Sequence, residues 1–219
     1  MERVPACEPA EIVARLCHQV RNPLATIQSG VQLVQVLARP TGEAAECLET
    51  ALGEVGRIDA MLRDANRIVR LAPGPTLRVD LAHFASQAAI GHGSGAIEVD
   101  ALVPDGPAEL WVNTSPELLL IALNELLGRA VRVTPEGGPV HLRWGEHGTD
   151  GVTLEVDDGG ACFAAEGREQ TLRAVSATWP GGGLGLCLVE RACALLGGHL
   201  DWTGLSPQGC RFRITLPRG

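Results

Sequence analysis

Aromatic side chains and runs of basic residues are nearly missing from this sequence. It contains no tyrosine, and aromatic residues make up only 3% of its 219 residues. A platform that stacks unpaired bases needs such rings, so that kind of binding site is not expected. The net charge is -8, and no basic run occurs anywhere. Since binding to a phosphate backbone requires concentrated positive charge, we predict that the protein does not bind nucleic acid.

Hydrophobic runs of membrane-spanning length and paired cysteines are also absent. No apolar stretch approaches the roughly 20 residues that a membrane span needs, and residues 1–5 do not resemble a signal peptide. The seven cysteines form no C-x-x-C pair and leave one over, so neither a disulfide framework nor a zinc site is indicated. We therefore expect a cytoplasmic protein that does not enter a membrane, has no membrane sensor of its own and keeps its cysteines in core positions.

Two amphipathic helices are predicted in the first third of the chain. The first runs from about Pro9 to Ala38, and a turn at residues 39–42 separates it from a second that ends before residues 73–75. Two such helices cannot bury their apolar stripes alone, so pairing with a second copy into a four-helix bundle is expected, which predicts a homodimer. In the first helix the stripe expected to be buried consists of Ile12, Leu16, Val20, Leu24, Ile27, Val31 and Val34.

A histidine lies within the first helix but off its apolar stripe. His18 should therefore face solvent or a docking partner, and Asn22, four residues on, shares that face. Pro23 cannot donate its backbone N–H and crowds the carbonyl of Gln19, which costs about 3 kcal/mol in a helix interior. One interpretation is that a kink at this proline presents His18 as a phosphoryl carrier. The other is that His18 is a polar surface residue and that Pro23 ends a short helix.

Beyond residues 73–75, a candidate domain boundary, strand-like and helix-like patterns follow one another. They predict an α+β sandwich, in which helices cover one face of a mixed sheet. Ser115, Pro116 and Glu117 form a helix start with a cap, a proline in the first turn and an acid near the positive helix end. That helix is expected to reach Val133. The other predicted elements are strands at 77–80, 97–103, 140–144, 152–158, 199–203 and 210–216, and helices at 81–90 and 184–196.

Two stretches of this second part carry residues that suit nucleotide binding. Asp158 ends a predicted strand in its buried phase, where a carboxylate can accept a hydrogen bond from an adenine amino group. Gly160 would let a ring approach the backbone, although an Asp-Asp-Gly-Gly sequence also suits a plain turn. Further along, Gly181, Gly183 and Gly185 precede a helix whose N-terminal N–H groups can receive phosphates.

Together these stretches resemble the histidine protein kinases of two-component signalling, in which a histidine box on a helical hairpin precedes a nucleotide-binding domain. The resemblance extends from about residue 11 to residue 217. It implies that residues 1–73 form a dimerisation and histidine-phosphotransfer hairpin and that residues 76–219 form an α/β sandwich of the histidine-kinase ATPase type. The same resemblance implies ATP as the nucleotide and a response-regulator receiver domain as the partner.

The glycine-containing stretches match the two glycine boxes of the family. The first box is Asp-x-Gly-x-Gly, which this sequence matches through Asp158 and Gly160, with Cys162 at the place of the last glycine. The second box corresponds to the G-x-G-x-G pattern at residues 181–185. As in the family, a helix and a closing pair of strands follow it. The resemblance therefore implies that Asp158, Gly160 and the glycines of the second box bind nucleotide.

The helix that ends near Val133 departs from the family. There the family reads Asn-x-x-x-Asn-Ala, and its second Asn holds the magnesium that bridges the phosphates, whereas this sequence has Glu125 and Arg129 at the two places. A guanidinium has no lone pair to give a metal, so magnesium is not expected to bind through Arg129. Arg129 could instead pair with phosphate directly, or be a solvated arginine on a helix whose nucleotide function has lapsed.

The histidine box and the lid depart from the family as well. Gln19 follows the histidine where the family usually has Glu or Asp to accept the imidazole proton, and an amide is not a base at neutral pH. Asn22 stands where, in the family, a Thr or Asn positions water for removing phosphate from a partner regulator. The lid segment, residues 163–180, is shorter than expected of a kinase lid.

Three interpretations of the function remain open. The first is an autokinase that phosphorylates His18 from ATP and passes the group to a response-regulator aspartate, which Asp158 and the glycine-rich loop favour. The second is a phosphotransfer or phosphatase module that uses His18 without ATP, which Gln19, Arg129 and the short lid favour. The third is a non-enzymatic dimeric scaffold. Of these, we expect a phosphotransferase of the histidine-kinase type.

Overall fold

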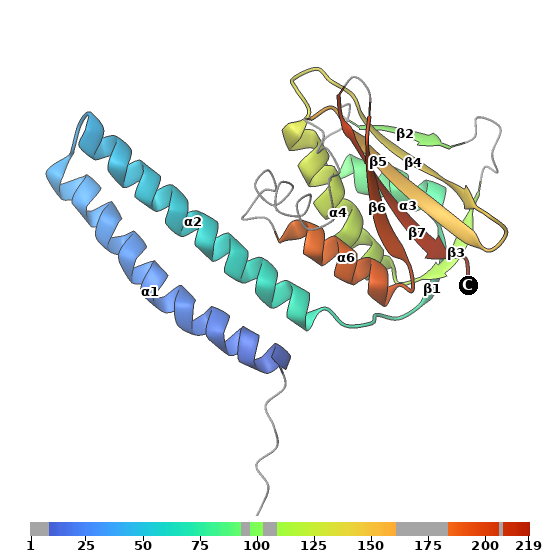
Figure 1. Cartoon of the computed structure of the whole chain (residues 1–219), viewed down its shortest axis with the longest axis horizontal. Coiled ribbons are helices and arrows are strands. Elements are labelled where there is room, and N and C mark those ends of the chain that lie inside the picture. Colours follow the sequence, from blue (N-terminus) through green and yellow to red (C-terminus); the bar gives the residue numbers. More distant parts are fainter. Residues whose placement is uncertain (1–8, 93–96, 103–108, 161–183, 206–207) are drawn as a thin grey trace, which may run out of the picture. The chain divides into compact units, whose positions relative to one another are not determined.

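The computed structural model describes residues 9–92, 97–102, 109–160, 184–205 and 208–219 (Figure 1). The chain contains two compact units, a helical unit that ends at Leu71 and a mixed unit that begins at Ala72. The helical unit is a hairpin, and the mixed unit combines a five-stranded sheet with helices. The predicted fold class, a helical hairpin followed by an α/β sandwich, is therefore confirmed.

The helical unit pairs α1 (Pro9–Ala38) with α2 (Glu43–Arg70). Gly42 precedes α2 with a φ of 61°, a left-handed conformation that glycine adopts without strain. Acidic residues occupy the first turn of α2 and basic residues its last turn, where each sign of charge is stabilised by the helix dipole. Because α1 continues through Pro23, the alternative in which this proline ends a short helix is wrong.

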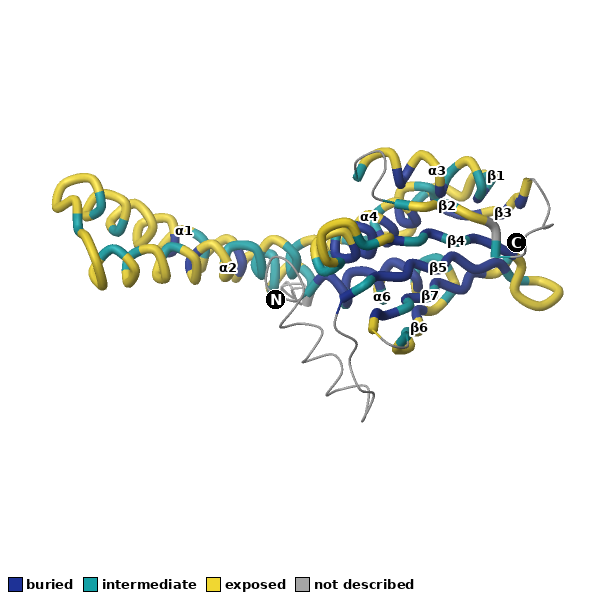
Figure 2. Tube along the Cα trace, turned by 90° about the horizontal axis from the view of Figure 1, so that it is seen from above, coloured by how far each residue is buried: buried dark blue, intermediate teal, exposed yellow. Residues whose placement is uncertain are grey.

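The face of α1 that packs on α2 contains only part of the predicted apolar stripe. The buried side chains of the hairpin are Cys17 and Leu24 in α1 and Val55 in α2. Figure 2 shows that most of both helices is exposed in the single chain. Within one chain Leu24 of the stripe is buried but most of the stripe is not, because the face of α1 that α2 covers overlaps the stripe only in part. The exposed members, with 41% to 53% of their surface accessible, are Ile12, Leu16, Val20, Ile27 and Val34.

The mixed unit contains a five-stranded sheet in the order β2-β4-β5-β7-β6 and a separate antiparallel pair, β1 and β3. In the large sheet β2 and β4 run parallel, and the other neighbouring strands are antiparallel. The strands are β1 (Leu77–Asp80), β2 (Ile97–Ala101), β3 (Trp111–Thr114), β4 (Val140–His147), β5 (Gly151–Asp158), β6 (His199–Gly204) and β7 (Cys210–Pro217). Among the described strands, β3 is the one that the sequence did not predict.

The described helices of this unit are α3 (Leu81–Ile90), α4 (Pro116–Val133) and α6 (Gly185–Leu195). α4 packs against both α6 and β5, which encloses the core between helices and sheet. It begins as predicted, because the Ser115 side chain accepts a hydrogen bond from the backbone N–H of Leu118 at 3.5 Å and Pro116 lies in the first turn. α4 therefore carries its residues toward the end of β5, where Asp158 lies.

The described cysteines occupy both buried and exposed positions. Cys17, Cys193 and Cys210 are buried, as expected of core residues. Burial raises the pKa of the Cys193 thiol to about 12, so this thiol stays protonated at neutral pH. Cys187 is partly exposed and Cys47 is exposed on α2. The expectation that the cysteines fill core positions is therefore wrong for Cys47.

Candidate functional site

The candidate phosphoryl carrier lies on the outside of the hairpin. His18 is exposed on α1, and so are Gln19 and Asn22. The preceding residue, Cys17, is only 4% exposed and packs in the hairpin, so the helix turns the imidazole toward solvent. The predicted exposure of His18 is confirmed, whereas its role as a phosphoryl carrier stays a prediction.

A shallow, open groove of about 260 Å³ runs along α1 next to the histidine box. It is lined by Ile12, Arg15, Leu16 and Gln19. Ile12 and Leu16 belong to the apolar stripe and expose about half of their surface, 46% and 53%. The lining of this groove therefore combines two apolar side chains with one arginine and one amide.

Arg21 links the two helices just after the histidine box. Its Nε donates a hydrogen bond to Asp59 Oδ1 on α2 at 2.9 Å, and Arg63 contacts the other oxygen of that carboxylate. The Arg21 and Asp59 side chains are 41% and 28% exposed, so this ion pair contributes about 0.2–1 kcal/mol. The sequence did not single out Asp59, because an acid on another helix belongs to no local motif.

A buried ion pair joins two of the predicted nucleotide-binding residues. Arg129 on α4 donates from Nη1 to Oδ2 of Asp158, which ends β5. The two side chains are 1% and 0% exposed. The guanidinium also lies over the ring of Phe212 on β7, 4.9 Å from its centroid. Asp158 is therefore buried as predicted, but the interpretation of Arg129 as a solvated surface residue is wrong.

The turn that follows Asp158 is folded against the end of α4. Asp158 Oδ1 accepts a hydrogen bond from the backbone N–H of Gly160 at 2.9 Å, and Thr134 Oγ1 accepts one from Gly159 at 2.9 Å. A Cβ atom at Gly160 would lie 2.7 Å from Val133 Cγ2 and 3.1 Å from Asp158 Oδ1. The space that this glycine leaves is therefore filled by the protein itself rather than kept for a ring.

Of the remaining residues predicted to bind nucleotide, the structure describes two. Glu125 is half-buried on α4, one turn before Arg129. Gly185 is the buried first residue of α6. Gly181 and Gly183 lie outside the described residues, as do Cys162 and the predicted lid at residues 163–180.

Arg129 does not fit the place of a metal ligand. Its guanidinium offers no lone pair and is already engaged with Asp158. In the part of the chain that the structure describes, no group of three or more His, Cys, Asp or Glu side chains could hold a metal ion. The Asp158 carboxylate, in turn, uses both of its oxygens within the chain. Arg129 and Asp158, paired with each other, therefore do not form a magnesium site.

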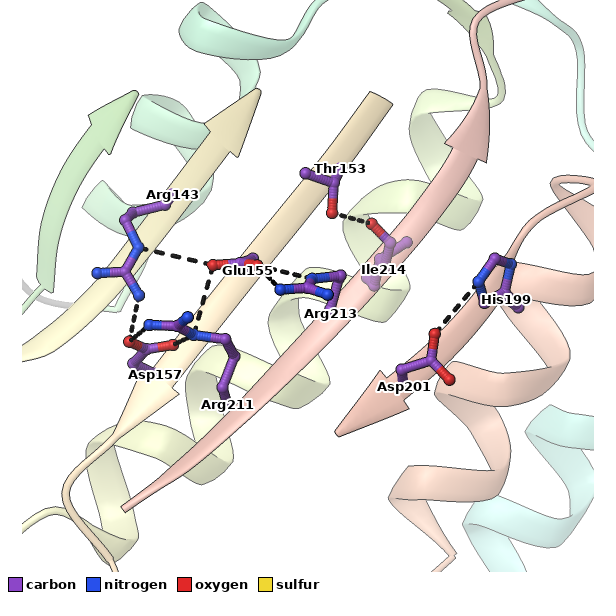
Figure 3. Close-up of polar contacts among 9 residues, drawn as sticks. All are labelled: Arg143, Thr153, Glu155, Asp157, His199, Asp201, Arg211, Arg213 and Ile214. Carbon is purple, nitrogen blue, oxygen red and sulfur yellow. Dashed lines mark hydrogen bonds and ion pairs between the residues drawn. The ribbon is translucent and has the colours of Figure 1, made fainter. Parts of the chain in front are cut away.

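A second set of ion pairs covers the sheet face turned away from the helices (Figure 3). Arg211 Nε donates to Asp157 Oδ1 at 2.8 Å, and Arg213 Nε donates to Glu155 Oε1 at 2.7 Å. Arg143 contacts both acids from the neighbouring strand. Burial raises the pKa of Asp157, but the hydrogen bonds from Arg211 and Arg143 outweigh this and hold the pKa below its ordinary value. These contacts hold β4, β5 and β7 together.

Two family models match the chain. Residues 10–74 match the His Kinase A (phospho-acceptor) domain, and residues 114–219 match the histidine kinase-, DNA gyrase B-, and HSP90-like ATPase. The chain belongs to the two-component histidine kinase family. In this histidine kinase family member, His18 lies within the region matched by the phospho-acceptor model. Arg129 and Asp158 lie within the region matched by the ATPase model.

Curated relatives of this family member are sensor kinases. Sensor-like histidine kinase SenX3 of Mycobacterium tuberculosis is 25% identical over 219 aligned residues, which cover 94% of this chain and 53% of SenX3. Sensor histidine kinase CpxA of Escherichia coli is 28% identical over 223 aligned residues, which cover 94% of this chain and 46% of CpxA. The chain thus spans about half the length of the curated relatives it matches. Within its described residues, no helix combines the length and the apolar character needed to cross a bilayer.

Solved histidine kinase structures share the two-part fold of this family member. Full-length ShkA in complex with AMPPNP superposes with a TM-score of 0.62 at 25% identity, over 95% of this chain and 46% of ShkA. Histidine kinase AdeS of Acinetobacter baumannii superposes with a TM-score of 0.60 at 16% identity, over 92% of this chain and 98% of the AdeS chain. Both likenesses include the hairpin as well as the sandwich.

Proposed function

We propose that this protein is a histidine-kinase-type phosphotransferase that carries a phosphoryl group on His18 and exchanges it with an aspartate of a response-regulator receiver domain. The observation that carries the proposal is the exposure of His18 on α1, within the region that matches the phospho-acceptor model. An imidazole nitrogen with an accessible lone pair is a nucleophile toward phosphorus. The match to a known phospho-acceptor domain supports this role over that of a plain surface histidine.

The proposed transfer needs no group that this chain lacks. An unprotonated nitrogen of the His18 ring attacks the phosphorus of an aspartyl phosphate on the receiver domain. The new P–N bond forms as the bond between phosphorus and the carboxylate oxygen breaks, and the aspartate leaves as a carboxylate. The reverse reaction returns the phosphoryl group to the aspartate. Gln19 would orient the ring and Asn22 would position a water molecule for hydrolysis of the aspartyl phosphate, since both are exposed on the same helix as His18.

The proposed active form is a homodimer. The hairpin buries few of its own side chains, while five members of the apolar stripe stay 41% to 53% exposed in the single chain. Burying a valine, leucine or isoleucine side chain fully contributes about 1.5–3 kcal/mol. A second hairpin packed on this face would supply the cover that α2 does not, as in a four-helix bundle.

A second candidate is a phosphotransfer or phosphatase module that works through His18 without using ATP. The Arg129–Asp158 ion pair favours it, because both residues stand at predicted nucleotide-binding positions and are engaged with each other. Transfer from ATP requires neutralisation of phosphate charge and alignment of the phosphates. An arginine held by an internal carboxylate supplies neither.

Two labelling reactions test these proposals. The wild type and His18→Ala are incubated with γ-labelled ATP and magnesium, and separately with receiver domains labelled through acetyl phosphate. His83→Ala, which removes an exposed histidine of α3, is the matched control. Acid-labile label from ATP that requires His18 supports an autokinase. Label exchanged only with receiver domains, and dependent on His18, supports the ATP-independent module. No label on this chain in either reaction, together with no His18-dependent loss of label from the receiver domains, overturns both and favours a non-enzymatic scaffold.

A further inference from the structure

We propose that Arg129 is the permanent ion-pair partner of Asp158. The pairing makes the Asp158 carboxylate unavailable to the amino group of a bound base. The domain would then have no preference for adenine over guanine nucleotides. The inference concerns the mixed unit alone and is independent of phosphotransfer through His18. Its test measures equilibrium binding, so its failure is distinguishable from failure of the proposed phosphotransfer.

Both partners of this ion pair are enclosed by the protein. The Arg129 side chain is 1% exposed and the Asp158 side chain is 0% exposed. They come from different elements, since Arg129 lies in the last turns of α4 and Asp158 at the end of β5. A ligand can therefore reach the carboxylate only if the protein around the pair rearranges.

Both oxygens of the carboxylate have partners within the chain. Oδ2 accepts a hydrogen bond from Arg129 Nη1, and Oδ1 accepts one from the Gly160 N–H at 2.9 Å. The bond to Arg129 joins two full charges, and such bonds are roughly twice as strong as neutral ones. The amino group of a base is neutral, so it cannot replace the positive charge that a buried carboxylate requires. Exchange of Arg129 for the base is therefore unfavourable.

The guanidinium is held on a second side as well. It lies over the Phe212 ring on β7, with 4.9 Å between the Arg129 Cζ and the ring centroid. The attraction between a cation and an aromatic face is stronger where water is excluded, as it is here. To reach a phosphate, Arg129 would have to leave both Asp158 and Phe212. The structure therefore favours the role of counter-ion over that of phosphate ligand.

A closed carboxylate has a measurable consequence for base selection. The exocyclic amino group of adenine donates a hydrogen bond, whereas guanine carries a carbonyl oxygen at the equivalent place. An accessible carboxylate accepts only, so it attracts the first and repels the second. When Asp158 is paired with Arg129, this source of discrimination is absent.

Isothermal titration of the full chain with AMPPNP and with GMPPNP tests the inference, with magnesium chloride and separately with EDTA. For the wild type we expect dissociation constants for the two nucleotides within about threefold of each other. Arg129→Asn should bind AMPPNP at least about tenfold more tightly than the wild type does, with no comparable gain for GMPPNP. Arg143→Gln is the matched control, because it removes an arginine from ion pairs on the other face of the sheet and should change neither affinity.

A comparison of the wild type with Asp158→Asn can overturn the inference. If the wild type binds AMPPNP at least about tenfold more tightly than GMPPNP, and Asp158→Asn removes that preference, the carboxylate is open to the base and the inference is wrong. A folded Arg129→Asn variant with unchanged affinity for AMPPNP would also contradict it. If Arg129→Asn does not fold, the nucleotide preferences of the wild type and of Asp158→Asn still show whether the carboxylate contacts the base.

Discussion

Replacing Arg129 by methionine probes the buried ion pair, because methionine keeps much of the side-chain volume and removes the charge. The Arg129 and Asp158 side chains are 1% and 0% exposed. Removing one partner of so buried a pair costs about 3–5 kcal/mol, since the other charge remains in the interior without compensation. Loss of the contact with the Phe212 ring adds about 0.5–2 kcal/mol. We therefore expect the free energy of unfolding of the mixed unit to fall by about 3.5–7 kcal/mol.

Urea unfolding followed by tryptophan fluorescence measures this loss in the intact chain. Both hairpin helices lack tryptophan, whereas Trp111, Trp144 and Trp202 lie on β3, β4 and β6, so a change in the signal of these three reports on the mixed unit. Arg218→Gln is the matched control, because Arg218 pairs with Glu146 at 3.0 Å in the same unit while the two side chains are 43% and 50% exposed. Removing this exposed pair should cost about 0.2–1 kcal/mol.

A double variant separates the ion pair from the rest of the side-chain packing. Arg129→Met combined with Asp158→Asn leaves no unpaired charge, so its loss should be smaller than the sum of the two single losses by more than about 1 kcal/mol. If Arg129→Met costs no more than Arg218→Gln, the reasoning from burial is refuted. Additive losses in the double variant would refute it too, because they would show that the two side chains do not interact.

Three further outcomes follow from other parts of the structure. Gly160→Ala should lower the unfolding free energy by about 1–3 kcal/mol in the same assay, because the new methyl group would lie 2.7 Å from Val133 Cγ2. The pKa of Asp157 is held below its ordinary value of 3.8, so its stabilising contribution is complete above that value and is lost as the pH falls through the lower folded-state pKa. Asp157→Asn should therefore be less stable than the wild type at neutral pH, and the difference should shrink on acidification; a constant difference would contradict this. A thiol reagent should modify exposed Cys47 in the folded protein, whereas Cys193, with a pKa of about 12, should react only on unfolding.

Element boundaries were predictable where they depend on a few adjacent residues. The start of α4 follows from a serine cap and a proline, and the structure has both in place. β3 was missed because its residues are not buried in the order that their polarity predicts. The polar Thr114 is buried together with Val112, whereas the aromatic Trp111 is 37% exposed. Its partner strand, β1, is also distant in sequence. Pairing of that kind leaves no local signal.

The contacts of the candidate site were less predictable than its members. Arg129 and Asp158 stand 29 positions apart on different elements. Considered alone, the arginine suits a phosphate and the aspartate suits the amino group of adenine. Only the fold shows that they bind each other. The hairpin illustrates the same limit, because the period of apolar residues defines a face but does not identify the helix that covers it. Leu24 of α1 is buried in the hairpin, whereas Val20, on the same predicted stripe, is 41% exposed.

Exchange of phosphate between a histidine and an aspartyl phosphate makes smaller demands on this chain than transfer out of ATP. The first needs an accessible imidazole and a surface on which a receiver domain can dock, and both the exposed His18 and an open groove are found on α1. The second also needs cations that neutralise the phosphates, and Arg129 is held by Asp158 instead. The two activities can therefore be lost or kept separately. Labelling of His18 by γ-labelled ATP at the same rate in the wild type and in Arg129→Asn would show that the ion pair has no influence on ATP use.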